Sequence, residues 1–193
     1  MDEVRIAGDR DVRVTVDTPD AGAAVVACPP HPQLGGRRTD PRLRAVGRAL
    51  GERGVACLRF DYGPWDGGEG ERRDARTVLA RARREHDPVG LFGYSFGAGV
   101  ALLTAAGDPP AALSVLAPPA TLAGEDTTDA VATVNCPLQV LHGERDGTVD
   151  WRAVLDRAPA GAVVESFPTG HGFGGHHDDV GASVGAFFAE ALE

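Results

Sequence analysis

The sequence contains no lysine, so all 19 of its basic residues are arginines, and 28 aspartates and glutamates outnumber them. The formal net charge is −9 at pH 7. A nucleic-acid-binding chain normally carries a basic stripe, and none is visible here, so nucleic acid is not an expected partner. The acidic, lysine-free composition fits equally a GC-rich genome or adaptation to high salt.

Long apolar runs are also missing from the chain. No stretch approaches the roughly 18 to 20 apolar residues that a transmembrane helix needs. The acidic N-terminus, Met1–Arg5, is not followed by the apolar core of a signal peptide. We therefore expect neither a membrane anchor nor a membrane partner.

Cysteine is scarce, with three residues that are odd in number and far apart: Cys28, Cys57 and Cys136. They fit neither a disulfide framework nor a zinc-binding spacing. Because disulfides form mainly in oxidising compartments, this pattern favours a reducing, cytoplasmic setting.

What the 193 residues do contain is a regular alternation of short apolar runs and amphipathic segments. Alternating residues before position 19 predict two strands joined by a Gly8-Asp9 turn. Continuous apolar runs, typical of strands buried on both faces, then alternate with helical patterns. We expect these strands at 23–28, 55–60, 89–92, 111–116, 138–141 and 162–167, and helices at 41–53, 70–86, 96–106, 127–134, 151–158 and 180–192.

This order of elements predicts one α/β domain over residues 1–193. Its sheet should be mostly parallel, with helices on both faces and an antiparallel hairpin at the N-terminal edge. In such sheets, function lies at the carboxyl ends of the strands, so the loops after the strands are the places to look for chemistry.

The loop after the third parallel strand carries the most specific motif, Gly93-Tyr94-Ser95-Phe96-Gly97. A G-x-S-x-G sequence between a strand and a helix is typical of a nucleophile elbow, where a tight turn pushes the serine side chain out of the sheet. Ser95 would also lie at a helix N-terminus, where N–H groups and the helix dipole favour a developing oxyanion. We predict that Ser95 is a nucleophile rather than only a helix cap.

A serine nucleophile needs a general base, and the base needs an orienting carboxylate. Asp146 lies in the loop after the strand at 138–141 and precedes Gly147, so it can point back across the strand ends. Glu144 and Asp150 are rivals, and Asp150 directly precedes a helix that it should cap. Asp146 is therefore the predicted acid, with a turn-forming Asp-Gly pair as the alternative.

The predicted base is His171, the only histidine that comes directly after the last strand. Gly170 and Gly172 flank it and would free its backbone to project the ring. His176 and His177 lie further along and are expected to be exposed loop and cap residues.

The alternative to a histidine base is a metal cluster made of His171, His176, His177 and Asp178. Their spacing matches no established ligand set, so no metal is expected. Of the remaining histidines, His142 is expected to support the acid loop, and His86 to be exposed near the end of its helix.

An oxyanion hole needs two N–H donors. One should be the backbone N–H of Phe96, the residue after the nucleophile. The second should come from the loop after the strand at 23–28, where prolines have no N–H to donate. Of the candidates His31, Gln33 and Leu34, we favour His31, because the neighbouring prolines stiffen the loop.

With these motifs in place, the chain resembles the α/β-hydrolases, and more narrowly the small bacterial and archaeal hydrolases near the dienelactone hydrolase branch. Their first loop commonly has His-Pro-His-Pro and then a Gly-Gly pair, where this chain has Pro29-Pro30-His31-Pro32 and Gly35-Gly36. The segment Arg59–Gly63 is similar to their next strand and loop. The resemblance covers residues 20–192 and implies an α/β-hydrolase fold. Dienelactone hydrolases carry cysteine at the elbow, so Ser95 argues against dienelactone as the substrate.

The sequence thus predicts a serine hydrolase that cleaves a small ester or thioester through an acyl-enzyme and needs no cofactor. An amidase or peptidase, and a non-catalytic binding or scaffold protein of the same fold, remain the alternatives. Residues 117–137, between two strands, leave room for one short helix and a loop but not for a large cap. The site should therefore be open, bordered by Tyr94, Pro64 and Trp65, and should take short acyl groups.

Overall fold

The computed structural model describes residues 2–6 and 10–193, so the predicted Gly8-Asp9 turn lies outside the described residues. These residues contain an eight-stranded sheet in the order β1-β2-β4-β3-β5-β6-β9-β10. Its strands are β1 (Asp2–Ile6), β2 (Val12–Asp17), β3 (Ala24–Cys28), β4 (Ala56–Asp61), β5 (Val89–Tyr94), β6 (Leu113–Leu116), β9 (Leu138–Gly143) and β10 (Val163–Phe167).

Within this sheet, β4, β3, β5, β6, β9 and β10 run parallel to one another, and β2 runs antiparallel to both of its neighbours. The fold is therefore the expected α/β-hydrolase architecture, with the antiparallel hairpin β1-β2 at one edge. Strands β3, β5, β6 and β9 are buried along their whole length, which explains why their residues are mostly apolar. Two polar exceptions, Ser114 of β6 and Gln139 of β9, bond to each other.

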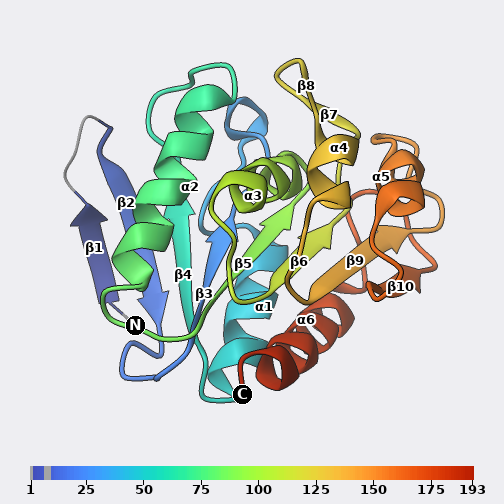
Figure 1. The fold of residues 1–193 in the computed structure, drawn as a ribbon. Helices are drawn as coiled ribbons and strands as arrows, with labels where there is room; N and C mark the ends of the chain where they lie inside the picture. Colours follow the sequence, from blue (N-terminus) through green and yellow to red (C-terminus); the bar gives the residue numbers. More distant parts are fainter. Residues whose placement is uncertain (1, 7–9) are drawn as a thin grey trace.

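Helices cover both faces of the sheet (Figure 1). On one face lie α1 (Pro41–Gly51) and α6 (His177–Ala191), and on the other lie α2 (Glu69–Ala82), α3 (Phe96–Gly107), α4 (Thr127–Ala132) and α5 (Trp151–Arg157). Each face has its own apolar layer. Phe188 of α6 packs on the first face, and Leu102 of α3 on the second.

The order of the strands in the sheet determines where the candidate site lies. β4 lies on one side of β3 and β5 on the other, so the loops after β3 and β5 leave the sheet next to each other. This is the switch point at which parallel sheets open a crevice. The two loops carry the His31 segment and the Ser95 elbow.

The segment between β6 and β9 holds a two-stranded hairpin, β7 (Thr121–Leu122) with β8 (Glu125–Asp126), followed by α4. The short helix was expected, and the hairpin was not, because two-residue strands have no periodicity to detect. This hairpin projects beyond the sheet at the end where the site lies (Figure 1). Among the described residues, none of the helices combines the length and the apolar character that a membrane span requires.

One expectation about the second helix was wrong. The helix ends at Ala82 rather than at 86, and His86 is buried instead of exposed. Its backbone N–H still bonds to Ala82, and its ring Nδ1 lies 2.8 Å from the carbonyl oxygen of Ala21. A partner more than 60 residues away in sequence fixes this ring, so local pattern could not reveal it.

Candidate active site

Ser95 lies in the sharp turn between β5 and α3, with φ 56° and ψ −120°. Few residues other than glycine adopt a positive φ, and such strain is concentrated at functional sites. The turn is held by the N–H of Ser95, which donates to the carbonyl of Leu116 at 2.8 Å. The backbone therefore presents the serine side chain above the carboxyl ends of β5 and β6.

The two glycines of the elbow are required by close approach of backbone. A Cβ atom on Gly93 would lie 2.1 Å from the carbonyl oxygen of Gly97, and one on Gly97 would lie 2.3 Å from that of Cys28. Both distances are far below a normal contact. Glycine at these positions lets the start of α3 press against the loop that leaves β3.

Ser95, His171 and Asp146 form a continuous chain of hydrogen bonds. The Ser95 Oγ lies 2.9 Å from Nε2 of His171, and the His171 Nδ1 lies 2.8 Å from Oδ2 of Asp146. The Asp146 side chain is fully buried, and its Oδ1 accepts the N–H of Thr148 at 2.9 Å. The structure thus brings together the three residues predicted from separate loops, in the geometry of a nucleophile, base and acid.

Two residues, Tyr94 and Arg42, hold the loop that carries His171. The Tyr94 hydroxyl donates to the carbonyl of His171 at 2.9 Å, and the Arg42 Nη1 donates to the carbonyl of Gly172 at 2.9 Å. The Arg42 guanidinium also stacks 4.5 Å above the Tyr94 ring. Burial raises the pKa of Tyr94 to about 12, so its hydroxyl stays protonated as a donor at neutral pH. Tyr94 was expected at the site, whereas no sequence pattern pointed to Arg42.

The rival carboxylates have other tasks. Asp150 caps α5, accepting the N–H of Ala153, and Glu144 accepts the hydroxyl of Ser166. Neither is bonded to His171.

The rival histidines have other hydrogen-bond partners. His176 pairs with Asp179 at 2.9 Å, and His177 Nε2 lies 3.0 Å from the carbonyl oxygen of Gly172. Within residues 2–6 and 10–193, no group of three or more His, Cys, Asp or Glu side chains is arranged to hold a metal ion.

His142 is buried at the start of the acid loop and stacks on Trp151, with ring centroids 3.6 Å apart. Burial lowers the pKa of His142 below its ordinary value of about 6.5. The ring supports the junction of β9 and α5, as expected from its place in the sequence.

The backbone N–H groups of Phe96 and His31 are the two that were expected to bind an oxyanion. Within the described part of the chain, neither of them has a hydrogen-bond acceptor. The other candidates in the His31 loop are occupied, because the Leu34 N–H donates to the carbonyl of His31 and the Gln33 N–H donates to the His31 ring. His31 itself precedes the short 3-10 helix η1 (Pro32–Leu34), and its ring lies 4.8 Å from that of Phe96.

Two cavities meet at Ser95 and His171. The larger, of about 470 Å³, is mostly apolar, with walls that include Trp65, Leu122 and Val149. The smaller, of about 300 Å³, is more polar and is lined by residues of the β3 loop and of the start of α1, and by Tyr94. A carbonyl carbon at Ser95 would therefore have an apolar compartment on one side and a polar one on the other.

The border expected from the sequence is only partly present. Trp65 lines the apolar cavity and Tyr94 the polar one, but Pro64 lines neither. The carbonyl of Pro64 instead accepts a hydrogen bond from Arg10. Sequence reasoning missed Leu122, which reaches the site only because the β7-β8 hairpin folds over it.

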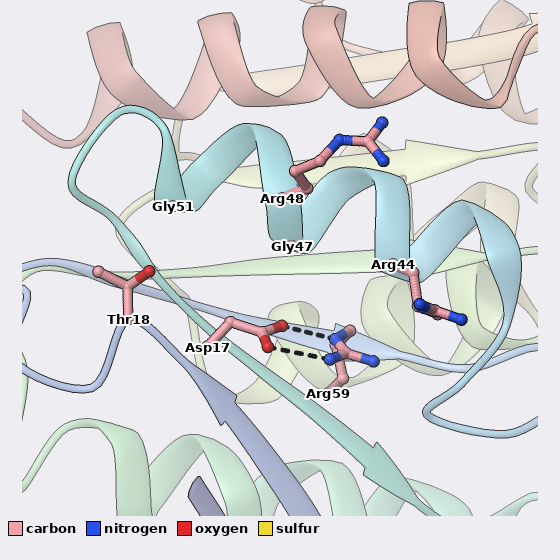
Figure 2. A pocket seen from close by; sticks show the side chains of 7 residues that line it. All are labelled: Asp17, Thr18, Arg44, Gly47, Arg48, Gly51 and Arg59. Carbon is pink, nitrogen blue, oxygen red and sulfur yellow. Dashed lines mark hydrogen bonds and ion pairs between the residues drawn. The ribbon is translucent and has the colours of Figure 1, made fainter. Parts of the chain in front are cut away.

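A third cavity, of about 390 Å³, lies under α1 and shares no residue with the two at Ser95 (Figure 2). Its lining includes Arg44 and the ion pair of Asp17 with Arg59, which join at 2.7 and 3.0 Å. Asp17 neutralises Arg59, and the lining holds no pair of nucleophile and base. This cavity therefore holds none of the candidate catalytic residues.

Comparisons with known proteins show the family of the chain. The model of the dienelactone hydrolase family matches residues 68–188, a range that includes Ser95, Asp146 and His171. No curated protein matches the chain at a significant level.

Several solved structures are similar over nearly the whole chain. An α/β serine hydrolase without lid from Xanthomonas campestris is 28% identical, with a TM-score of 0.85 over 99% of this chain and 94% of that one. An α/β serine hydrolase homologue from Coxiella burnetii is 24% identical, with a TM-score of 0.84 and 96% of each chain covered. Est1E from Butyrivibrio proteoclasticus with bound ferulic acid is 19% identical, with a TM-score of 0.86 over 98% of this chain and 99% of that one.

Proposed function

The chain belongs to the dienelactone hydrolase family of α/β hydrolases, and we propose that it is a serine hydrolase that cleaves small esters or thioesters through an acyl-enzyme. The observation that carries the proposal is the hydrogen-bonded chain from Ser95 through His171 to Asp146. The strained backbone of Ser95 supports it, since a serine that served only as a helix cap would not need that conformation.

The first half of the reaction forms the acyl-enzyme. His171 Nε2 takes the proton of Ser95 as Oγ attacks the carbonyl carbon, and the buried carboxylate of Asp146 stabilises the imidazolium. The backbone N–H groups of Phe96 and His31 bind the oxyanion that develops on the carbonyl oxygen. The imidazolium then gives its proton to the departing alkoxide or thiolate.

The second half releases the acid. A water molecule gives a proton to His171 and attacks the acyl carbon, and the returning proton restores the Ser95 hydroxyl. No step requires a cofactor. Serine stands where dienelactone hydrolases carry cysteine. A serine hydroxyl is less acidic than a cysteine thiol and depends more on an adjacent base, which is consistent with the hydrogen bond to His171.

Labelling with a fluorophosphonate probe tests the proposal directly. The wild-type protein should become covalently labelled, and Ser95→Ala should stay folded and unlabelled. Ser183→Ala is the matched control, because Ser183 lies on α6 and bonds to Gln139 and Glu165, away from the elbow. Wild-type labelling in Ser95→Ala would refute the assignment, and an unlabelled, inactive wild type would favour a scaffold protein.

A panel of acyl esters, thioesters and amides would then separate the esterase from an amidase or peptidase. We expect hydrolysis of activated esters and thioesters with amides far slower, because the amine is a poorer leaving group.

A further inference from the structure

Trp65 forms one wall of the apolar cavity from an exposed loop. It lies between β4 and α2, its side chain is 40% exposed, and its ring stacks on that of His31 at 4.7 Å. The Phe96 ring is 5.7 Å away. A bulky side chain on such a loop would sample several positions unless the loop backbone were fixed.

Two buried carboxylates on α2 hold that backbone. Glu71 is 0% exposed and accepts the N–H groups of Asp66 at 3.0 Å and of Gly68 at 2.7 Å, one on each oxygen. Asp74, one helical turn further and 1% exposed, accepts the N–H of Gly63 at 2.9 Å. The loop is thus bonded to α2 on both sides of Trp65.

One arginine from the other side of the loop completes the arrangement. Arg10 donates through Nε and Nη2 to the two oxygens of Asp74, at 2.9 and 3.1 Å, and through Nη2 to the carbonyl of Pro64. Its Nη2 also lies 3.6 Å from Oε1 of Glu71. Two buried carboxylates this close repel each other, and a cation between them offsets that repulsion.

The chain leaves space for this guanidinium. A Cβ atom on Gly70 would lie 2.4 Å from Cζ of Arg10, and one on Gly63 would lie 3.4 Å from its Nη2. Arginine suits the place because its planar fork reaches Asp74 with two donors and the loop carbonyl at the same time. A lysine ammonium lacks this fork, so it could not pair with both oxygens of Asp74 and reach the Pro64 carbonyl in the same geometry.

We propose that Arg10, with Glu71 and Asp74, is a positioning residue that fixes the Trp65 wall and so sets the preference of the apolar cavity for the acyl chain. Arg10 does not touch the reacting atoms. It acts through Trp65, on chains long enough to reach that wall, and has little effect on an acetyl group. The inference rests on the proposed function, because it assigns selectivity to the Ser95 site.

The kinetic test compares p-nitrophenyl butyrate with p-nitrophenyl acetate. Arg10→Met and Trp65→Ala should each lower the butyrate-to-acetate ratio of kcat/KM by about threefold to tenfold, since two methylene groups lose an apolar wall. The loss should lie mainly in KM for butyrate. Arg5→Met is the matched control, because Arg5 forms an exposed ion pair with Asp11 on the same hairpin, and its ratio should not change.

A double-mutant cycle separates positioning from general destabilisation. If Arg10 acts through Trp65, Arg10→Met should change the ratio little in a Trp65→Ala background. Additive effects of the two substitutions would overturn the proposal. Arg10→Lys keeps a cation but not the planar fork, so its butyrate-to-acetate ratio of kcat/KM should lie between those of the wild type and Arg10→Met. If Arg10→Met does not fold, Arg10→Lys replaces it in the test.

Fluorescence gives a readout that needs no activity. The chain has two tryptophans, so in a Trp151→Phe background the emission reports on Trp65 alone. Arg10→Met should shift this emission to the red and increase its quenching by acrylamide, and Arg5→Met should do neither. Unchanged emission in a folded Arg10→Met protein would overturn the proposal. If the wild type hydrolysed neither ester, the proposed function would fail, and the fluorescence would still decide whether Arg10 holds Trp65.

Discussion

His171 is the residue whose surroundings define the proposed chemistry most directly. Its two ring nitrogens face a hydroxyl on one side and a buried carboxylate on the other. His177 also reaches the same loop, where its Nε2 lies 3.0 Å from the carbonyl oxygen of Gly172, which Arg42 bonds as well. The two histidines therefore differ in kind, one placed to move a proton and the other to steady a loop.

Substitution of the two histidines should separate these roles. His171→Ala should lower kcat/KM for a p-nitrophenyl ester by about 10³-fold or more, since it removes the general base and acid. His177→Ala should cost about tenfold or less, because Arg42 and Tyr94 still hold the loop. Steady-state kinetics with equal thermal stability of both variants checks this. A large loss from His177→Ala with a near-normal His171→Ala would reverse the assignment of the base.

Among the elements, the start of α3 and the end of β3 depend on each other. A Cβ atom on Gly97 would lie 2.3 Å from the carbonyl oxygen of Cys28 and 2.4 Å from that of Pro29, so glycine at this position lets the helix approach both carbonyls. That approach sets the His31 loop beside Ser95, so the nucleophile and its expected oxyanion donors are brought together by the packing of two elements rather than by either loop alone.

Gly97→Ala should therefore reduce both stability and activity. The new Cβ would lie 2.3 Å from the Cys28 carbonyl oxygen, and overpacking of this kind costs about 1–3 kcal/mol. Gly161→Ala is the control, because nothing lies within 4 Å of its Cβ position, and its free energy of unfolding should change by less than about 1 kcal/mol. Urea denaturation measures both. Equal stability of the two variants would show that the α3 contact is not tight.

The junction of β9 and α5 depends on a neutral histidine. His142 stacks on Trp151 in a buried position, and burial lowers its pKa. Above about pH 6.5 the ring is neutral in the folded and unfolded states alike. Below that value the unfolded chain takes up a proton that the folded protein resists, so the free energy of unfolding falls as the pH falls.

His142→Phe keeps an aromatic ring on Trp151 and removes this titration. The free energy of unfolding of the wild type, relative to that of His142→Phe, should therefore decrease between pH 7 and pH 5. Urea unfolding of both proteins at several pH values measures the difference, and the other histidines cancel because both proteins contain them. Parallel stability curves over this range would contradict the expectation.

At the scale of the whole molecule, the site is an open edge of the sheet. Only the β7-β8 hairpin and the six-residue helix α4 lie between β6 and β9. The apolar cavity of about 470 Å³ is bounded by side chains from several loops rather than by a helical cap. Without a helical cap, these walls offer apolar contact to a short acyl group, and we expect a long chain to extend beyond them into water.

The dependence on acyl length follows from this shape. A buried methylene contributes about 0.8 kcal/mol, so a four-carbon chain gains from the cavity while a sixteen-carbon chain leaves most of its length in water. We expect kcat/KM to be higher for p-nitrophenyl acetate and butyrate than for palmitate, measured below the solubility limit of each. A clear preference for palmitate would mean that another part, such as a second subunit, closes the site.

Much of the fold and the order of the site residues could be predicted from the sequence, because both depend on local sequence patterns. Buried parallel strands need continuous apolar runs, so their places could be found within a few residues. A strand-to-helix turn that exposes a serine needs glycines on both sides, which marks Ser95. Asp146 and His171 could be named because each follows a predicted parallel strand, and the carboxyl ends of parallel strands meet at one edge.

Only the tertiary structure decided what holds these residues in place. Arg42 steadies the His171 loop across 130 residues, Arg10 reaches Asp74 across 64, and His86 turns inward to Ala21 across 65. None of these contacts produces a periodic pattern in the sequence. In each of them, a single side chain pairs with a backbone group or a carboxylate that only the packing of the fold brings near. The sequence by itself determined which residues could do chemistry, and the folding of distant segments decided which of them meet, since hydrogen bonds and close packing depend on distance in space.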